Sequence, residues 1–170
     1  MSTDYISKDL SNLLLQYLES DQIPWVFSLD GVKDINTSEF YDSPQFTHTI
    51  VEGDYVGNIH PLIHNLWKAM YSAHPEAFEN FTHLSRIKCN MITRGADSTP
   101  HVPHYDRYTP HTVIVYYVND SDGITRIYDG DNCIEVVPEH GKYIIFNGAL
   151  KHCGSSPLTH NHRIVINFNF

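Results

Sequence analysis

The residues best suited to chemistry in this chain are His104 and Asp106, which stand two positions apart in the segment His104-Tyr105-Asp106. Side chains two apart on an extended strand point to the same face, so we expect the imidazole and the carboxylate to project together while Tyr105 points away. A third ligand must come from another strand, and His152 is the best candidate because it follows a predicted strand and a short turn. Two histidines and one carboxylate that leave other positions open are typical of non-haem ferrous sites, so these residues predict an Fe(II) centre.

Other interpretations of this set remain open. Taken alone, the His104 and Asp106 pair also fits a surface ion pair, because residues 95–110 are rich in turn residues. The chain has 12 histidines, and four more lie near the set; we interpret them as surface residues or as neighbours of the ligands. They are His101, His111, His160 and His162. A structural zinc site would need four closed protein ligands, whereas this set offers three.

The last predicted strand, residues 162–170, carries a cation. Ile164 and Ile166 fall on one face of its alternating pattern, and Arg163 falls on the other. The apolar face suits packing against helices, which turns Arg163 toward the interior. A buried guanidinium is costly without an anionic partner, and no fixed carboxylate is evident from the sequence. We therefore expect a small-molecule carboxylate to bind Arg163 in a bidentate manner, the alternative being an ion pair at the sheet edge.

The elements that must position these residues change in type along the chain. Apolar residues recur at helical spacing over 6–18, with Ser7 as N-cap, and over 62–70, with Asn58 as candidate cap and Pro61 in the first turn. A short helix is expected to begin at Pro75, and residues 21–56 show no clear pattern. The remaining segments favour strands: 86–93, 112–119, 124–128, 133–137, 141–147 and 162–170, with a hairpin turn over 129–132. This order predicts a mainly β (α+β) fold, a sandwich or barrel backed by N-terminal helices.

Composition sets limits on the class of protein. The 170 residues fit one domain, and the net charge of −9 argues against a protein that binds nucleic acid or anionic lipid as its main task. The longest apolar run, 113–118, is far too short for a membrane span, and the first residues show no secretory signal. The 3 cysteines are widely spaced and form no CxxC motif, which indicates a reduced, cytoplasmic protein.

Taken in order, His104-x-Asp106, His152 and Arg163 resemble the motif of the Fe(II)/2-oxoglutarate-dependent dioxygenases, over about residues 86–170. The likeness is greatest to the prolyl-4-hydroxylase-like branch. Three further segments carry it: 112–119 (TVIVYYVN), 122–128 (DGITRIY) and 137–146 (VPEHGKYIIF).

This resemblance implies a double-stranded β-helix (jelly roll) in a single domain over residues 1–170. Residues 1–85 would be a helical or mixed region that supports the core and shapes substrate choice, and residues 86–170 would be the catalytic core. His104, Asp106 and His152 would bind Fe(II).

The resemblance also assigns a co-substrate site. Arg163 would pair with the distal carboxylate of 2-oxoglutarate, Tyr117 would help it, and Asn90 would face the same molecule. The implied enzyme is a hydroxylase that uses 2-oxoglutarate and O2 to hydroxylate a C–H bond and releases succinate and CO2.

The resemblance favours peptidyl proline as the substrate, and a related small molecule is the alternative. The partner is therefore expected to be a peptide, a protein or a small molecule. Two other functions stay open: a cupin-like metal-binding isomerase or sensor, which would not need Arg163, and a catalytically inactive binding module. Binding of 2-oxoglutarate would separate the first of these from a dioxygenase.

Overall fold

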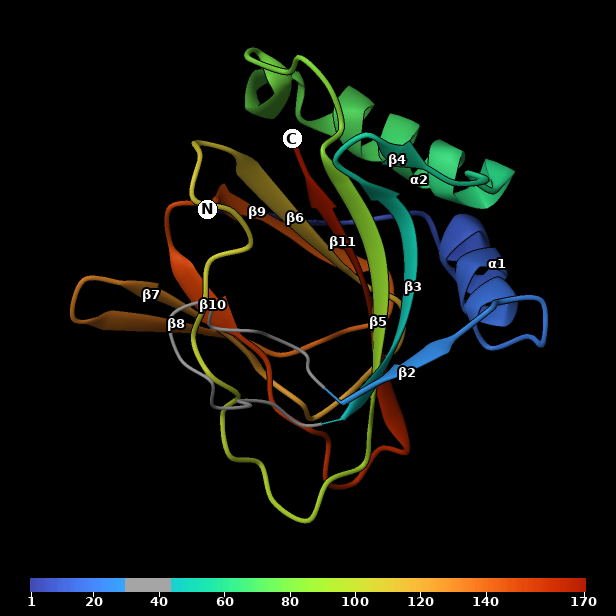
Figure 1. The fold of residues 1–170 in the computed structure, drawn as a ribbon, viewed down its shortest axis with the longest axis vertical. Helices are drawn as coiled ribbons and strands as arrows, with labels where there is room; N and C mark the ends of the chain where they lie inside the picture. The colour runs from blue at the N-terminus through green and yellow to red at the C-terminus, as the bar shows by residue number, and fades with distance from the viewer. Residues whose placement is uncertain (30–43) are drawn as a thin grey trace.

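The computed structural model describes residues 1–29 and 44–170, which form two antiparallel sheets and a small number of helices (Figure 1). The helices are α1 (Lys8–Leu18), α2 (Pro61–Ala73) and the 3-10 helix η1 (Pro75–Phe78). The strands are β1 (Ser2–Tyr5), β2 (Val26–Ser28), β3 (Gln45–Glu52), β4 (Tyr55–Val56), β5 (Arg86–Thr93), β6 (Thr112–Tyr117), β7 (Thr125–Asp129), β8 (Asn132–Val136), β9 (Lys142–Asn147), β10 (Lys151–Cys153) and β11 (His162–Asn169). The expected mainly β architecture is confirmed.

The larger sheet has the order β1-β9-β6-β11-β5-β3-β2, with β4 paired to β3. The smaller sheet has the order β10-β7-β8. The predicted strands from residue 86 onward are present with small shifts at their ends. The unassigned region 21–56 contributes β2, β3 and β4, and the N-terminal strand β1, which the sequence did not indicate, pairs with β9.

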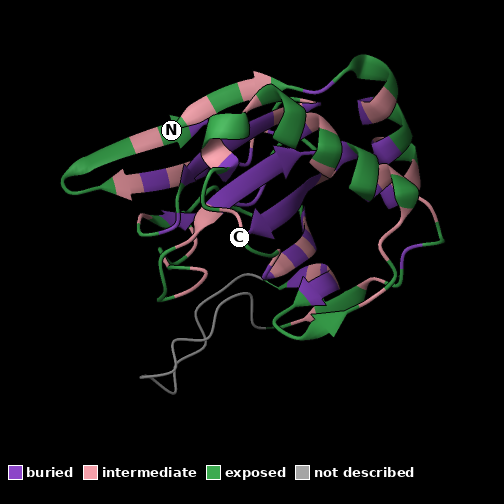
Figure 2. Cartoon of the chain, turned by 90° about the horizontal axis from the view of Figure 1, so that it is seen from above, coloured by how far each residue is buried: buried purple, intermediate pink, exposed green. Residues whose placement is uncertain are grey.

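Two apolar clusters lie on the two faces of the larger sheet. One cluster joins both helices to the sheet and includes Leu14, Leu66, Ile166 and Phe168. Figure 1 shows the helices covering that face. The other cluster, which includes Val115, Tyr117 and Val165, lies between the two sheets, and Figure 2 shows the buried residues gathered along the central strands. The alternation predicted for β11 is therefore confirmed, and it directs Arg163 to the face between the sheets.

The helix starts differ in part from the expectation. Ser7 is the N-cap of α1, although its side chain makes no capping hydrogen bond. Asn58 was the wrong choice for α2, because its N-cap is His60, whose Nδ1 accepts a hydrogen bond from the Leu62 amide at 3.3 Å. Pro61 occupies the first turn as expected, where its missing N–H has no partner to lose. None of the helices among the described residues is long and apolar enough to cross a membrane.

Asp122 holds the turn that leads into β11. Its carboxylate accepts hydrogen bonds from the amides of Leu158, Thr159 and His160 at 2.9, 3.0 and 3.2 Å, and from the His160 ring at 2.8 Å. Although partial burial raises the pKa of Asp122, these hydrogen bonds outweigh it and hold the pKa well below its ordinary value. The turn that sets the start of β11, and so the place of Arg163, depends on this one carboxylate.

We expect Asp122→Asn to lower the free energy of unfolding at pH 7 by about 1–2 kcal/mol, because the amide accepts fewer and weaker hydrogen bonds. A carboxyl group whose pKa is depressed in the folded state stabilises the fold above its unfolded pKa of about 4, and this stabilisation is lost as the pH falls toward the folded pKa. The difference in free energy of unfolding between wild type and variant should therefore narrow as the pH falls from about 4 toward 2. Urea denaturation at several pH values measures this difference, and Asp131→Asn, at an exposed position, is the control. A difference that does not depend on pH would contradict the prediction.

Candidate metal centre

His104, Asp106 and His152 come together between the two sheets. Each offers one ligand atom, and these atoms lie within 4.8 Å of one another. Nε2 of His104 is 4.0 Å from Oδ1 of Asp106, and Nε2 of His152 is 3.6 Å from Oδ2. Divalent ions bind such atoms at about 2.1 Å, so ligand atoms up to about 4.2 Å apart can share one ion, and atoms 4.8 Å apart would need to approach by about 0.6 Å. The arrangement therefore fits a metal ion held by two nitrogens and one carboxylate.

The local backbone around His104 is not the strand that the sequence indicated. His104 forms one isolated bridge with His152, in which each amide donates to the other carbonyl at 3.0 Å, and Asp106 lies outside any strand. His152 itself lies on β10, a short strand that the sequence reading missed and that pairs with β7. Tyr105 does point away, since it is 38% exposed and Lys151 lies over its ring. His104 and Asp106 therefore point to the same side from a loop and not from a strand. The two backbone hydrogen bonds between His104 and His152 hold this loop in place.

Backbone carbonyls orient both imidazole rings. Nδ1 of His104 is 3.0 Å from the Val102 carbonyl, and Nδ1 of His152 is 3.5 Å from the Leu150 carbonyl. A carbonyl oxygen only accepts, so each Nδ1 carries a proton, and in the neutral form of each ring Nε2 then has its lone pair toward Asp106. This is the tautomer that a metal ligand needs.

The Asp106 carboxylate is held by groups that the sequence reading missed. Oδ1 accepts from Arg86 at 2.8 Å, and Oδ2 accepts from the amides of Asn167 and Asn169, each at 2.9 Å. Burial raises the pKa of Asp106, but Arg86, His152 and the two amides outweigh it, so the pKa lies far below its ordinary value. The sequence could have indicated that Asn167 and Asn169 face the centre, because the alternation of β11 places both on the same face as Arg163.

His152 is neutral at physiological pH. Burial lowers its pKa to about 4, and the nearby Asp106 charge only partly offsets this effect. The Phe146 ring packs edge-on against it, with 5.2 Å between ring centroids. A neutral imidazole with a fixed lone pair is the form that binds a metal ion.

A cavity of about 90 Å³ joins these residues to Arg163. Its walls include all three residues of the centre together with Asn90, Thr125 and Arg163. Lys88 lines it as well, and burial lowers the Lys88 pKa. The cavity therefore places a candidate metal site and buried cations around one small space.

Arg163 is a buried cation whose positive charge is balanced by few neighbouring groups. It is 4% exposed, and Nη2 donates to Oγ1 of Thr125 at 2.6 Å. Within the described part of the chain its buried Nε has no hydrogen-bond partner, and no carboxylate forms an ion pair with the guanidinium. Burial lowers its pKa, and the neighbouring Tyr117 works against that effect. Thr125 was not among the predicted site residues, although it lies within the segment 122–128 that carries the family resemblance.

The two other predicted co-substrate residues differ in position. Asn90 lines the cavity. Tyr117 is fully buried with its ring centroid 5.8 Å from Cζ of Arg163, but it is not among the residues that line the cavity. The roles of both remain predictions.

The histidines considered as competing ligands lie elsewhere or beside the centre. His160 contacts Asp122, and His162 contacts Glu19. His101 lines the small cavity, and His111 lines a second, larger cavity.

Gly123 leaves room for Arg163. A Cβ atom at this position would lie 2.5 Å from the Ser155 carbonyl oxygen and 3.0 Å from Cδ of Arg163. We expect Gly123→Ala to lower the free energy of unfolding by about 1–3 kcal/mol and to displace the guanidinium, while the metal-binding trio stays in place. Calorimetric titration with Zn²⁺ and urea denaturation would check this. Unchanged stability, or lost metal binding in a folded variant, would contradict it.

The sequence matches no family model and no curated protein. Solved structures are similar over nearly the whole chain. A Pseudomonas putida prolyl-4-hydroxylase is 16% identical with a TM-score of 0.69, covering 99% of this chain and 91% of that one. A Trichoplax adhaerens prolyl hydroxylase, in complex with a peptide of the hypoxia inducible factor oxygen degradation domain, is 14% identical with a TM-score of 0.69, covering 99% and 82%.

A third similar structure is an oxidoreductase of the 2OG-Fe(II) oxygenase family from Burkholderia pseudomallei. It is 14% identical with a TM-score of 0.66, covering 98% of this chain and 84% of that one. At these identities the likeness is one of fold. The chain has the jelly-roll fold of the 2-oxoglutarate and Fe(II) oxygenases, as the resemblance implied.

Proposed function

We propose that the protein is an Fe(II)- and 2-oxoglutarate-dependent dioxygenase that hydroxylates a C–H bond and releases succinate and CO2. The observation that carries the proposal is the shared cavity of about 90 Å³, which has the His-Asp-His trio in its wall together with the buried Arg163. A jelly roll with a metal site alone would equally suit an isomerase or a sensor. The buried guanidinium without a carboxylate partner favours a co-substrate that supplies one.

In this proposal His104, Asp106 and His152 hold Fe(II). The bound iron supplies the activation of O2 that drives hydroxylation. Arg86, Asn167 and Asn169 keep the Asp106 carboxylate oriented and ionised.

Arg163 binds the distal carboxylate of 2-oxoglutarate, and the Thr125 hydroxyl fixes the plane of the guanidinium. Asn90 faces the same molecule from β5, and Tyr117 supports Arg163 from behind the cavity wall. The apolar cluster between the sheets, which includes Val115 and Val165, keeps water from the reacting atoms.

We further propose that residues 1–170 act as one catalytic domain, because strands from the first 85 residues and from the remainder share one sheet. Peptidyl proline is the favoured substrate, supported by the likeness to two prolyl hydroxylases, one of which holds a peptide. A small molecule related to proline is the alternative.

The test is an anaerobic titration of the protein with Fe(II) and 2-oxoglutarate, followed by admission of air. We expect a visible charge-transfer band that needs both additions, and then succinate. Iron binding without a response to 2-oxoglutarate would reject the proposal and favour the cupin-like alternative. Binding of both without succinate, even with proline peptides present, would favour an inactive binding module.

A further inference from the structure

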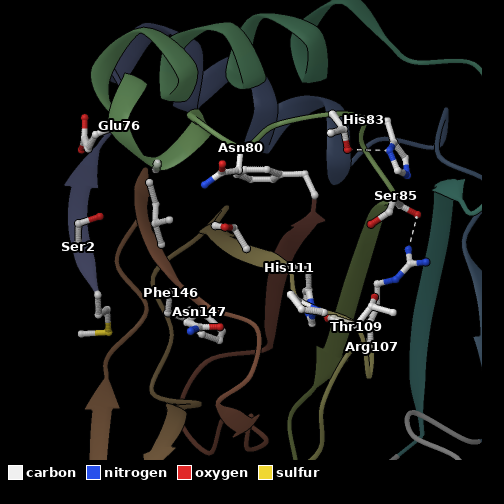
Figure 3. A pocket seen from close by; sticks show the side chains of 17 residues that line it. Ser2, Glu76, Asn80, His83, Ser85, Arg107, Thr109, His111, Phe146 and Asn147 are labelled. Carbon is white, nitrogen blue, oxygen red and sulfur yellow. Dashed lines mark hydrogen bonds between the residues drawn. The ribbon is translucent and has the colours of Figure 1, made fainter.

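A second cavity, of about 760 Å³, lies between η1, the segment that follows Asp106 and the end of β9 (Figure 3). This is the size range of pockets that enclose small ligands. Polar side chains from separate parts of the chain line it. They include Asn80, His83, Arg107, His111 and Asn147.

This cavity lies beside the candidate metal centre. Arg107, in its wall, directly follows Asp106 in the chain. Phe146, also in the wall, packs its ring against His152 with 5.2 Å between centroids. A molecule bound here would therefore contact side chains that adjoin two of the three residues of the centre.

Arg107 is the arginine in the wall of this cavity, and the described residues give it few partners. Among the described residues, its side chain makes one hydrogen bond, of 3.3 Å from Nη1 to the Ser85 carbonyl, drawn in Figure 3. Two other arginines of the chain pair with carboxylates: Arg86 with Glu52 and Asp106, and Arg126 with Glu135. No carboxylate of the described residues forms an ion pair with Arg107, in a chain whose net charge is −9.

The groups around Arg107 add hydrogen-bonding capacity without cancelling its charge. Nδ1 of His111 contacts the Thr109 carbonyl at 2.7 Å, and its buried Nε2 has no hydrogen-bond partner in residues 1–29 and 44–170. The ring rests on Gly148, where a Cβ would overlap it, so it is held in the cavity wall. Glu76 is the acidic residue of the lining, and its carboxylate contacts His74 at 3.2 Å.

We propose that this cavity binds the substrate and that Arg107 binds a carboxylate carried by that substrate. The proposal rests on the proposed dioxygenase function and adds the chemical class of the substrate, an acid. Arg107 would anchor the acid group one residue away from Asp106 in the chain, in a cavity whose wall includes the Phe146 ring that packs on His152. The carboxylate could belong to a small amino-acid derivative or to an acidic peptide side chain, and the experiment separates these sources.

The test follows the Arg107 Nε–H resonance of ¹⁵N-labelled full-length protein loaded with Zn²⁺ and saturated with 2-oxoglutarate, which keeps Arg163 occupied. The first pair of probes is N-acetylproline and N-acetylprolinamide. The second is the peptide acetyl-Ala-Pro-Asp-amide and its Asn counterpart. We expect the acid of one pair to shift the resonance and to bind about tenfold to a hundredfold more tightly than its neutral partner.

Variants complete the test. Arg107→Gln should remove the preference for the acid, and Arg107→Lys should keep part of it. Arg94→Gln is the control, since Arg94 is an exposed arginine bonded to Asn161 and to the carbonyls of Thr159 and His160. Equal binding of acid and neutral probe, a preference that survives Arg107→Gln, or no shift with any probe would overturn the proposal.

Succinate formation by the iron-loaded protein is measured separately. If succinate forms but Arg107 does not respond, only the substrate proposal fails. If Arg107 responds but succinate does not form, the anion site stands and the dioxygenase function fails.

Discussion

Replacing Asp106 by asparagine is expected to weaken Fe(II) binding by more than about a hundredfold and to abolish 2-oxoglutarate-dependent succinate formation. The carboxylate is the single anionic member of the trio, and both histidine Nε2 atoms lie within 4.0 Å of its oxygens. An amide removes the charge that attracts the metal ion. It also offers an N–H₂ group to Asn167 and Asn169, which already donate to this position.

The variant should remain folded but lose stability, by about 2–4 kcal/mol, because Arg86 loses a buried ionic partner. Calorimetric titration with Fe(II) under argon measures metal binding, and urea denaturation measures the fold. Glu135→Gln is the matched control, since it removes a carboxylate that pairs with Arg126 at the protein surface. Tight metal binding in a folded Asp106→Asn variant would show that the trio is not the metal site.

The proximity of His104 and Asp106 could be predicted because its signal, their spacing in the chain, is local. The two-residue spacing of His104 and Asp106 was enough to bring both to one side, although the strand assumed for it is absent. The alternation of β11 likewise predicted the orientation of Arg163. When one face of a strand is strongly apolar and packs on the helices, the residues between must point to the opposite face.

What the sequence could not predict depends on contacts between distant residues. Arg86 holds Asp106 across 20 positions, and Thr125 meets Arg163 across 38. Neither residue has a local pattern that marks it. The same holds for β1, a strand of alternating exposure whose existence depends on its pairing with β9.

Replacing Arg163 by methionine is expected to weaken 2-oxoglutarate binding by about a hundredfold or more, while Fe(II) binding is unchanged. Arg163 is a buried cation in the wall of the small cavity, and methionine keeps much of its length and volume without the charge. Thr125→Val, which removes only the hydrogen bond to Arg163, should have a smaller effect, about tenfold.

Stability distinguishes this role from a structural one. A buried arginine that serves the fold is paired, and its loss is costly, as expected for Arg86 with its two carboxylates. Among the described residues Arg163 hydrogen-bonds only to Thr125 and pairs with no carboxylate, so without co-substrate Arg163→Met should be as stable as wild type or more stable. Added 2-oxoglutarate should raise the melting temperature of the metal-loaded wild type and not that of the variant. A variant that is strongly destabilised yet binds 2-oxoglutarate normally would assign Arg163 to the fold instead of the co-substrate.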